Sequence, residues 1–383
     1  MLASQRALFD IPRDVCYLNA AAWSPLPIAV QEKGRAGVGR KSQPWTLPGS
    51  IINDQNERAR AAAARLINAS PDDVALIPSV GYGVATAGKV LKIPAGSRVL
   101  VIEDDHSSPV LEWMDRSVAA GFTVETVKRP ADGDWTAAVL AAIARPGAPP
   151  LALASMSSVH WSDGGLIDVD RIAPVLRALG AAFLIDATHG AGVQKIDVAT
   201  LDPDFLIFPT YKWLLGPYGR AFLYIAKRHQ EGTPLEQTAH GRRAVKAEQT
   251  TYLLDLRYVP NARRFDMGER DHFISMDMAA SGIEFIAGLG QQQVLERLSY
   301  LTGLIGAQLQ GAGVAVPETR VRAPHVICLT FKHGMPDGLI EKLAAEKIYV
   351  APRLGRIRVS PHVYNDEADV ERFTSTLQQL LKA

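Results

Sequence analysis

The chain contains 383 residues, of which 47% are hydrophobic and 21% are charged; one hydrophobic core rarely holds so many, so we expect two domains. Its 41 basic and 40 acidic residues leave a formal net charge of +1, which argues against nucleic acid as a partner. No run of about 18 apolar residues occurs, and the two cysteines have neither disulfide-framework nor metal-ligand spacing. We therefore expect a cytoplasmic protein with no membrane span and no metal site.

Short apolar runs alternate with longer Ala- and Leu-rich segments in the first two thirds of the chain. The apolar runs predict buried strands at 74–77, 98–102, 151–154, 182–185 and 205–208. The segments with charges at helical spacing predict helices at 55–68, 84–90, 136–145 and 169–179. This alternation indicates an α/β fold with a mostly parallel sheet, helices on both faces, and a ligand crevice at the carboxyl ends of the strands.

The alternation of strand and helix patterns ends at about residue 263. Helical patterns follow at 275–290, 292–311 and 367–381, and no internal repeat or low-complexity tract is evident. We predict a large domain at 26–262 and a smaller α+β domain formed by 1–25 together with 263–383.

Two candidate site residues directly follow predicted strands. Asp186 ends the run 182–185, and Lys212 follows the run 205–208 in an aromatic and apolar loop with a Gly-Pro turn. A lysine amine can form a Schiff base with pyridoxal phosphate, and a buried carboxylate can keep the pyridine nitrogen of that cofactor protonated. A surface lysine and a turn aspartate are the alternatives. The two residues together favour a cofactor site.

Four sequence motifs, spread over nearly the whole chain, support the prediction of a cofactor site. They are YLNAAAWSPLP at 17–27, LIDATHGAG at 184–192, YKWLLGPYG at 211–219 and RIRVSPHVYN at 356–365. In this order they resemble the class V aminotransferase superfamily, which includes cysteine desulfurases, isopenicillin N epimerase and kynureninase. The resemblance implies the PLP-dependent transferase (aspartate aminotransferase-like) fold with a mostly parallel seven-stranded sheet, pyridoxal 5'-phosphate as cofactor, and a homodimer.

The resemblance also implies roles for two histidines beside Lys212 and Asp186. His106, which follows the strand at 98–102, corresponds to the histidine that stacks on the cofactor ring and can move a proton. His189 stands where relatives often carry glutamine, and it can hydrogen-bond the phenolate oxygen of the cofactor. A solvated loop histidine and a structural histidine are the respective alternatives.

We expect backbone amides at a helix start to bind the cofactor phosphate. Ser79, Val80 and Gly81 follow the strand at 74–77 and precede a predicted helix, although relatives tend to carry threonine where Val80 and Gly81 fall. Thr210 and Tyr211, just before Lys212, are alternative sources of a hydroxyl group.

A second departure from the family pattern lies at 265–270. Relatives usually read RFExGT there, and their threonine reaches the phosphate of the neighbouring subunit. Gly268 is retained, but Glu269 places an anion where the hydroxyl would be. We expect that Glu269 points away from the phosphate or that Arg264 or Arg270 compensates for its charge.

The last motif supplies the candidate for binding the carboxylate of an amino acid or keto acid substrate. Arg358 matches the motif arginine, since Ser360 follows at the family spacing, and Arg356 is the competitor. Asn19 of the first motif is a further candidate for substrate binding. Trp161 either narrows the substrate pocket or belongs to the core.

The resemblance implies chemistry at the α-carbon of an amino acid, most simply an aminotransferase reaction. A β-eliminating lyase, an epimerase and an inactive binding protein of the same fold are the alternatives. The segment 348–355 holds no cysteine, so a persulfide-forming desulfurase is disfavoured. Neither a dinucleotide-binding glycine motif nor clustered metal ligands occur, which disfavours an oxidoreductase and a metal hydrolase.

Overall fold

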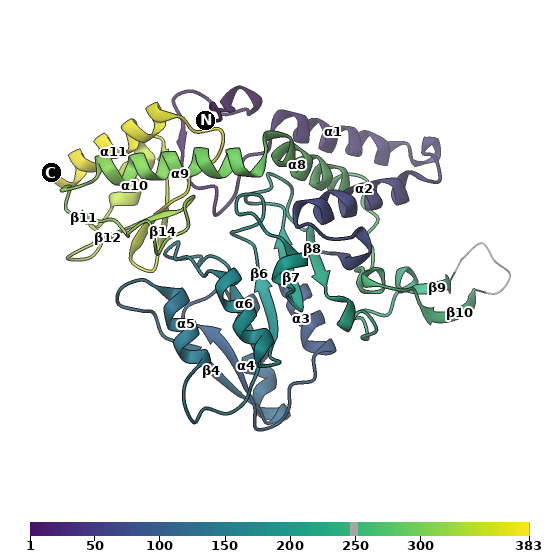
Figure 1. Cartoon of the computed structure of the whole chain (residues 1–383). Helices are drawn as coiled ribbons and strands as arrows, with labels where there is room; N and C mark the ends of the chain where they lie inside the picture. Colours follow the sequence, from purple (N-terminus) through teal and green to yellow (C-terminus); the bar gives the residue numbers. More distant parts are fainter. Residues whose placement is uncertain (246–251, 383) are drawn as a thin grey trace.

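A seven-stranded sheet forms the centre of the protein, whose computed structural model describes residues 1–245 and 252–382 (Figure 1). The strands are β2 Val74–Ile77, β3 Arg98–Ile102, β4 Thr123–Val127, β5 Leu151–Ser157, β6 Ala182–Asp186, β7 Phe205–Pro209 and β8 Ala221–Ile225. They lie in the order β2, β8, β7, β6, β5, β3, β4. Only β8 runs antiparallel to its neighbours. The predicted α/β fold with a mostly parallel seven-stranded sheet is confirmed.

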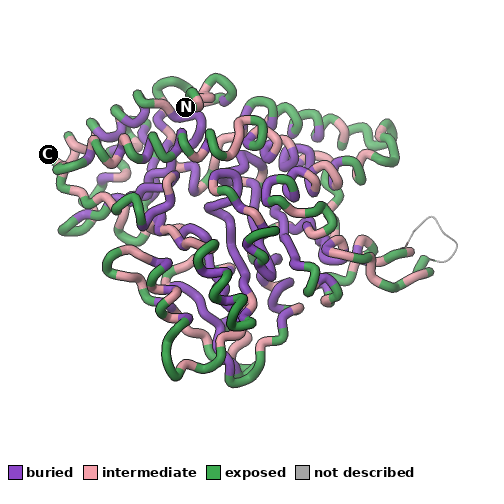
Figure 2. Tube along the Cα trace, in the orientation of Figure 1, coloured by how far each residue is buried: buried purple, intermediate pink, exposed green. Residues whose placement is uncertain are grey.

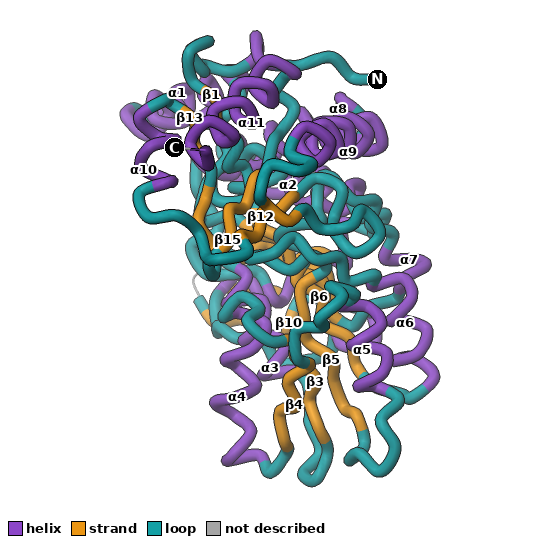
Figure 3. Tube along the Cα trace, turned by 90° about the vertical axis from the view of Figure 1, so that its left-hand side faces the viewer, coloured by secondary structure: helices purple, strands orange, loops and turns teal. Residues whose placement is uncertain are grey.

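Helices cover both faces of this sheet (Figure 3). They are α3 Val80–Val90, α4 Ser108–Ala120, α5 Trp135–Ile143, α6 Val169–Ala178 and the short α7 Val198–Leu201. Side chains alternate along β3, so that Leu100 and Ile102 pack with α5 and α6 while Val99 and Val101 pack with α3 and α4. Every residue of β3 is therefore buried, which explains its apolar run. Strand β7, in the middle of the sheet, is likewise buried along its whole length (Figure 2).

Helix α3 begins at Val80, earlier than the predicted residue 84. Ser79 caps it, since its hydroxyl accepts a hydrogen bond from the Tyr82 amide at 3.2 Å. The helix start therefore includes Val80 and Gly81, whose amides belong to its first turn. This places the N-terminus of α3 directly at the carboxyl end of β2.

A four-stranded antiparallel sheet lies in the C-terminal third, in the order β11, β12, β15, β14 (Figure 1). The elements of this region are β11 Val314–Ala315, β12 Ile327–Phe331, β13 Ile348–Tyr349, β14 Ala351–Arg353, β15 Arg356–Val359, α9 Gln291–Gln308, α10 Leu339–Ala345 and α11 Glu367–Lys382. The N-terminal strand β1 (Cys16–Tyr17) pairs in parallel with β13. The start of the chain thus packs with its end.

Helix α8 (Ser275–Leu289) lies in the range predicted for the small domain but packs against α1 (Ile28–Ser42) and α2 (Ile51–Leu66). Ala280 and Ile283 of α8 join the core beneath the large sheet. By packing, α8 therefore belongs with the helices of the large sheet. The division into 26–262 and the remainder stays a prediction.

A short antiparallel pair, β9 (Arg242–Val245) and β10 (Leu253–Tyr258), projects from the body of the protein (Figure 1).

Within residues 1–245 and 252–382, no helix combines the length and the apolar character that a membrane crossing requires.

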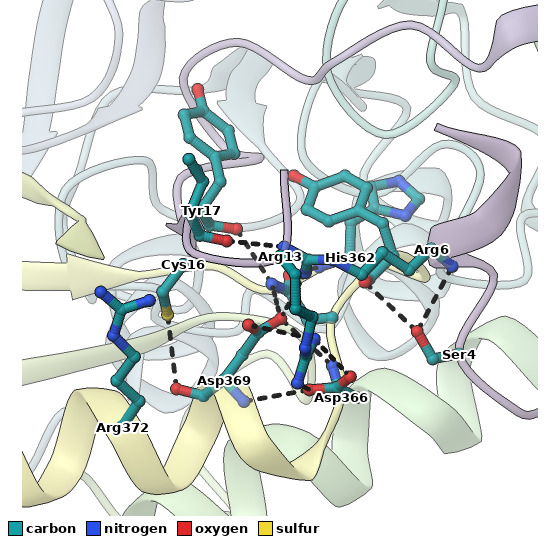
Figure 4. A network of polar contacts seen from close by, with 12 residues as sticks. Ser4, Arg6, Arg13, Cys16, Tyr17, His362, Asp366, Asp369 and Arg372 are labelled. Atoms are coloured by element: carbon teal, nitrogen blue, oxygen red, sulfur yellow. Dashed lines mark hydrogen bonds and ion pairs between the residues drawn. The ribbon is translucent and has the colours of Figure 1, made fainter. Parts of the chain in front are cut away.

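Polar contacts tie the N-terminal segment to the start of α11 (Figure 4). Arg6 Nη1 donates to Asp369 Oδ2 at 3.0 Å, and the Cys16 thiol donates to the Asp369 carbonyl at 3.3 Å. Asn365 Nδ2 donates to the Tyr17 carbonyl at 3.1 Å and to Asp369 Oδ2 at 2.9 Å. Tyr17 and Asn365 belong to the first and last sequence motifs, so this network holds the two motifs together.

Candidate active site

A cavity of about 290 Å³ opens at the carboxyl ends of β2, β5, β6 and β7. Its walls come from the segments that follow these strands and β3. They are Pro78, Ser79, Val80, Gly81, His106, Ser108, Ser157, Asp186, Thr188, His189, Pro209, Tyr211, Lys212, Tyr218, Gly219 and Arg220. Most of the residues predicted for the site therefore meet in one cavity, as expected for strand ends of a parallel sheet.

A larger cavity of about 780 Å³ lies at the opposite edge of the same sheet. Arg228 there pairs with Asp202 and with Asp204, each at 2.7 Å. These charged groups satisfy one another, and ligands of open α/β sheets bind at the other edge. We therefore assign the candidate active site to the smaller cavity.

Lys212 lies in the loop after β7, and only 7% of it is exposed. Burial, reinforced by the positive charge of Arg358 and opposed by Asp186, lowers the pKa of Lys212 to about 7. The loop is closed by Thr210, whose hydroxyl donates to the Pro217 carbonyl at 2.6 Å. A lysine with this pKa is about half neutral at pH 7, so a nucleophilic amine is present there, unlike for an ordinary lysine side chain.

His189 connects Lys212 to a tryptophan. Its Nδ1 accepts a hydrogen bond from Trp213 Nε1 at 3.3 Å, and its Nε2 lies 3.0 Å from Lys212 Nζ. An indole N–H can only donate, so Nδ1 of a neutral His189 is unprotonated and Nε2 carries the proton. Burial holds the pKa of His189 well below its ordinary value, with Lys212 adding to the effect. The Nε2–H of His189 therefore donates a hydrogen bond to the nitrogen of the neutral Lys212 amine.

Asp186 ends β6 and is 2% exposed. Its Oδ1 accepts hydrogen bonds from the Thr188 amide at 2.9 Å and from the Thr188 hydroxyl. Both donors of Thr188 are thus directed at one oxygen of this side chain, and no donor among the described residues forms a hydrogen bond with its Oδ2. The cavity thus contains a buried anion of the kind that a protonated pyridine nitrogen requires.

Asp105 is a site residue that the sequence reasoning missed. Its carboxylate accepts hydrogen bonds from the Ser157 hydroxyl at 2.6 Å, the Ser157 amide at 3.0 Å and the His106 amide at 2.8 Å. Burial raises its pKa to about 7 against these hydrogen bonds, and the charge of Asp186 raises it further. Asp105 therefore ties the loop of His106 to the end of β5. In the sequence, Asp105 belongs to the acidic run 103–105 directly before His106, and no role was predicted for it.

Two helix starts meet the cavity at one place. Ser79, Val80 and Gly81 belong to the start of α3, and Ser108 begins α4. A Cβ added to Gly81 would come no closer than 3.8 Å to Ser108 Oγ, so the space in front of Gly81 is open. Helix N-termini favour anions, and two of them suit a phosphate group.

Of the two residues just before Lys212, Tyr211 lines the cavity and Thr210 does not. Tyr211 lines the cavity, where its ring stacks on Tyr218 with centroids 3.8 Å apart. Thr210 does not line the cavity, because its hydroxyl is turned into the loop toward Pro217. The idea that Thr210 offers a hydroxyl to the phosphate has no support within this chain.

Gly268 also lies apart from the cavity. With Glu269 it lines a separate depression, and its amide donates to Glu236. Arg270 pairs with Asp266, and Arg264 lies 3.2 Å from Glu231. Within one chain Gly268 therefore does not reach the site, and a role across a subunit boundary stays a prediction.

Arg358 of β15 is 2% exposed, and its Nη1 donates to the Trp161 carbonyl at 2.6 Å. Among the described residues its Nε and Nη2 are buried without a hydrogen-bond partner, and so is Oδ1 of Asn19. Burial, and then the charge of Arg353, lowers the pKa of Arg358 to about 10. Unpaired donors on a buried guanidinium match a carboxylate ligand. Arg358 thus fits its predicted role better than Arg356, which is only half-buried.

The residues present fit pyridoxal phosphate on three independent features. The cavity holds an amine of lowered pKa, a buried carboxylate, and two helix N-termini. Once bound, such a cofactor acts as an electron sink for a carbanion at the α-carbon of an amino acid. An attachment point, a counter-charge and a phosphate-binding surface are what such a cofactor requires of a protein.

The chain is similar to known proteins both in sequence and in fold. Residues 17–373 match the family described as Aminotransferase class-V. The uncharacterized aminotransferase YcbU of Bacillus subtilis is 27% identical over 331 residues, covering 83% of this chain and 81% of that protein. Isopenicillin N epimerase of Amycolatopsis lactamdurans is 25% identical over 409 residues, covering 99% and 98%.

A solved structure with a similar fold is a C-DES variant with glycine covalently linked to its PLP cofactor. It has a TM-score of 0.85 and 19% sequence identity, and covers 98% of this chain and 99% of that one. Because the family match spans most of the chain, this protein belongs to the class V aminotransferase family of enzymes, whose cofactor is pyridoxal 5'-phosphate.

Proposed function

We propose that the protein is an aminotransferase that attaches pyridoxal phosphate to Lys212 and acts at the α-carbon of an amino acid. The observation that carries the proposal is the buried Lys212 amine, whose pKa is lowered to about 7 and which lies 3.0 Å from His189 in the cavity that Asp186 also lines. The name of the relative YcbU supports the aminotransferase reaction over its alternatives.

Each side chain of the site has a task in this proposal. Asp186 would balance the positive charge of a protonated pyridine nitrogen of the bound cofactor, and the Nε2–H of His189 would donate a hydrogen bond to its phenolate oxygen. Arg358 holds the α-carboxylate of the substrate through its two unpaired donors. With the cofactor and substrate bound, the Lys212 amine would accept the proton lost from the α-carbon of the substrate and would carry it to the carbon at which the product is protonated.

A protein thiol takes no part in this chemistry. Cys16 is fully buried, and Cys328 is 2% exposed. Burial raises the pKa of Cys328 to about 12, and it raises the pKa of Cys16 as well. These are the only two cysteines of the chain, so sulfur transfer through a protein persulfide is not supported.

Thiol-independent β-elimination and epimerisation are the second candidates, and the similarity to isopenicillin N epimerase favours including the latter. Both begin with the same removal of the α-proton. Assembly as a homodimer and a cytoplasmic location stay predictions.

The test is a product screen of the holoenzyme with amino acids, in the presence and absence of a keto acid acceptor. We expect conversion of the amino acid to its keto acid only when an acceptor is present, because the amino group must be passed on. Release of ammonia and a keto acid without an acceptor would instead identify a lyase. Inversion of the α-carbon, seen by chiral chromatography, would identify an epimerase.

The pH dependence of cofactor capture tests the state of Lys212. We expect the rate at which the apoprotein binds pyridoxal phosphate covalently to rise with pH and to level off above about pH 8, because only the neutral amine attacks the aldehyde and its pKa is about 7. Borohydride trapping at timed intervals measures this rate. A rate still rising steeply at pH 9 to 10, as with a free lysine side chain, would contradict the assignment.

A further inference from the structure

Three arginines gather on one face of the hairpin formed by β14 and β15. Arg356 and Arg358 lie two residues apart on β15, so they point to the same face, whereas Ile357 and Val359 are fully buried on the other face. Arg353 of β14 is paired in register with Arg356, which places it on that same face. The face is turned toward the large domain, because Arg358 donates to the Trp161 carbonyl.

Within residues 1–245 and 252–382, no carboxylate oxygen lies within 4.0 Å of any of these three guanidinium groups. By contrast, Arg129, in the large domain, is paired with Asp163 and Asp104. Like charges gathered at a half-buried surface repel one another unless an anion joins them. Burial lowers the pKa of Arg353, and the charge of Arg353 in turn adds to the lowering for Arg358 and Lys212.

Trp161 connects this face to the cofactor cavity. Its ring lies edge-on to the ring of His106, with centroids 6.3 Å apart, and the Arg353 guanidinium lies 5.9 Å from the Trp161 ring. The indole is fixed by a hydrogen bond from its Nε1 to the Asp104 carbonyl at 2.6 Å. Trp161 thus forms a wall with His106 at one end and Arg353 at the other.

We propose that the substrate is an amino acid with an acidic side chain, whose α-carboxylate is bound by Arg358 and whose side-chain carboxylate is bound by Arg353. The methylene groups of the substrate side chain would pack against the Trp161 ring. This inference rests on the proposed function, since it names the substrate class of the same site. A guanidinium beside an aromatic ring suits a carboxylate because the ring shields the pair from water without competing for its hydrogen bonds.

The experiment compares Arg353→Gln with the unaltered holoenzyme on aspartate and glutamate and on their amides, asparagine and glutamine. We expect the preference in kcat/KM for the acid over its amide to fall by about 10- to 100-fold, mainly through KM, because one charge-assisted hydrogen-bonded contact is lost. Arg353→Lys should retain part of the preference, since the charge remains but the planar fork is lost.

Arg356→Gln is the matched control, because it removes the same charge from the same hairpin, whereas the cation–π contact to Trp161 comes from Arg353. We expect it to change the acid preference by less than about threefold. If both variants lost the acid preference equally, the summed positive charge of the hairpin would be its cause. That result would overturn the assignment to Arg353. So would an Arg353→Gln variant that keeps its preference but changes its oligomeric state in sedimentation, which would make Arg353 a subunit contact.

Binding measurements separate this inference from the reaction itself. Succinate and glutarate should bind the holoenzyme in calorimetry, and Arg353→Gln should weaken that binding by about 10- to 100-fold. Such binding without any turnover of amino acids would sustain the carboxylate subsite and reject the aminotransferase proposal. Transamination of neutral amino acids that does not depend on Arg353 would support the aminotransferase proposal and reject the carboxylate subsite.

Discussion

Replacing Lys212 with alanine is expected to lower kcat/KM by at least about 10³-fold and to abolish the covalent adduct that borohydride fixes between the protein and pyridoxal phosphate. The reason is that Lys212 is both the attachment point and the proton carrier in the proposed reaction. Its amine is buried in the candidate active site with a pKa lowered to about 7. Mass spectrometry of the reduced protein and its near-visible absorbance measure the adduct, and a coupled assay measures turnover.

Lys128→Ala provides the matched control, since the Lys128 side chain is 79% exposed and pairs with Glu103 on the surface. We expect this variant to keep its adduct and its activity. If the Lys212→Ala protein still formed a borohydride-stable adduct at a single site, the cofactor would be attached elsewhere. If the unaltered protein bound no pyridoxal phosphate at all, an inactive relative of the family would be the better description.

The Asp186→Asn variant is expected to retain the adduct through Lys212 but to lose about 10²- to 10⁴-fold in kcat. The neutral amide can still accept the hydrogen bond of the Thr188 amide, but it no longer balances a positive charge on the ring nitrogen. Without that charge the ring withdraws electrons less strongly from the α-carbon. Single-turnover absorbance measurements with an amino acid separate this chemical step from cofactor binding.

Asp204→Asn tests whether loss of a buried carboxylate alone explains such a result. Asp204 is 7% exposed, accepts hydrogen bonds from the Phe183 amide and from Arg228, and lies at the opposite edge of the sheet. We expect this variant to unfold at a lower temperature while its folded fraction retains full kcat. An Asp186→Asn enzyme with undiminished kcat would refute the proposed role of Asp186.

The strands of the large sheet were predictable because each is a short apolar run buried on both faces. The predicted runs 98–102 and 205–208 correspond to β3 and β7, and β5 extends beyond its predicted end to Ser157. Helix starts were less predictable, as α3 shows, because the cap at Ser79 and not the apolar pattern decides where that helix begins. The packing of α8 on α1 and α2 depends on contacts between distant segments, which no local pattern indicates.

The residues after each strand also gave a largely correct list of cavity residues. Parallel strands bring their carboxyl ends to one edge, so Asp186, Lys212 and His106 meet there once the strand order is set. Thr210 was predicted from its place just before Lys212, and Gly268 from its place in the family pattern at 265–270. Their side-chain and backbone groups are engaged elsewhere, toward Pro217 and Glu236.

The sequence by itself determined the fold class, the family and the pair of Lys212 and Asp186, because strand runs and ordered motifs are local properties of the chain. Only the tertiary structure decided the protonation state that His189 takes between Trp213 and Lys212, and the convergence of Arg353 and Arg358 on Trp161. Burial and the charges of neighbouring residues determine these features. Both depend on which distant segments pack together, and a linear pattern does not contain that information.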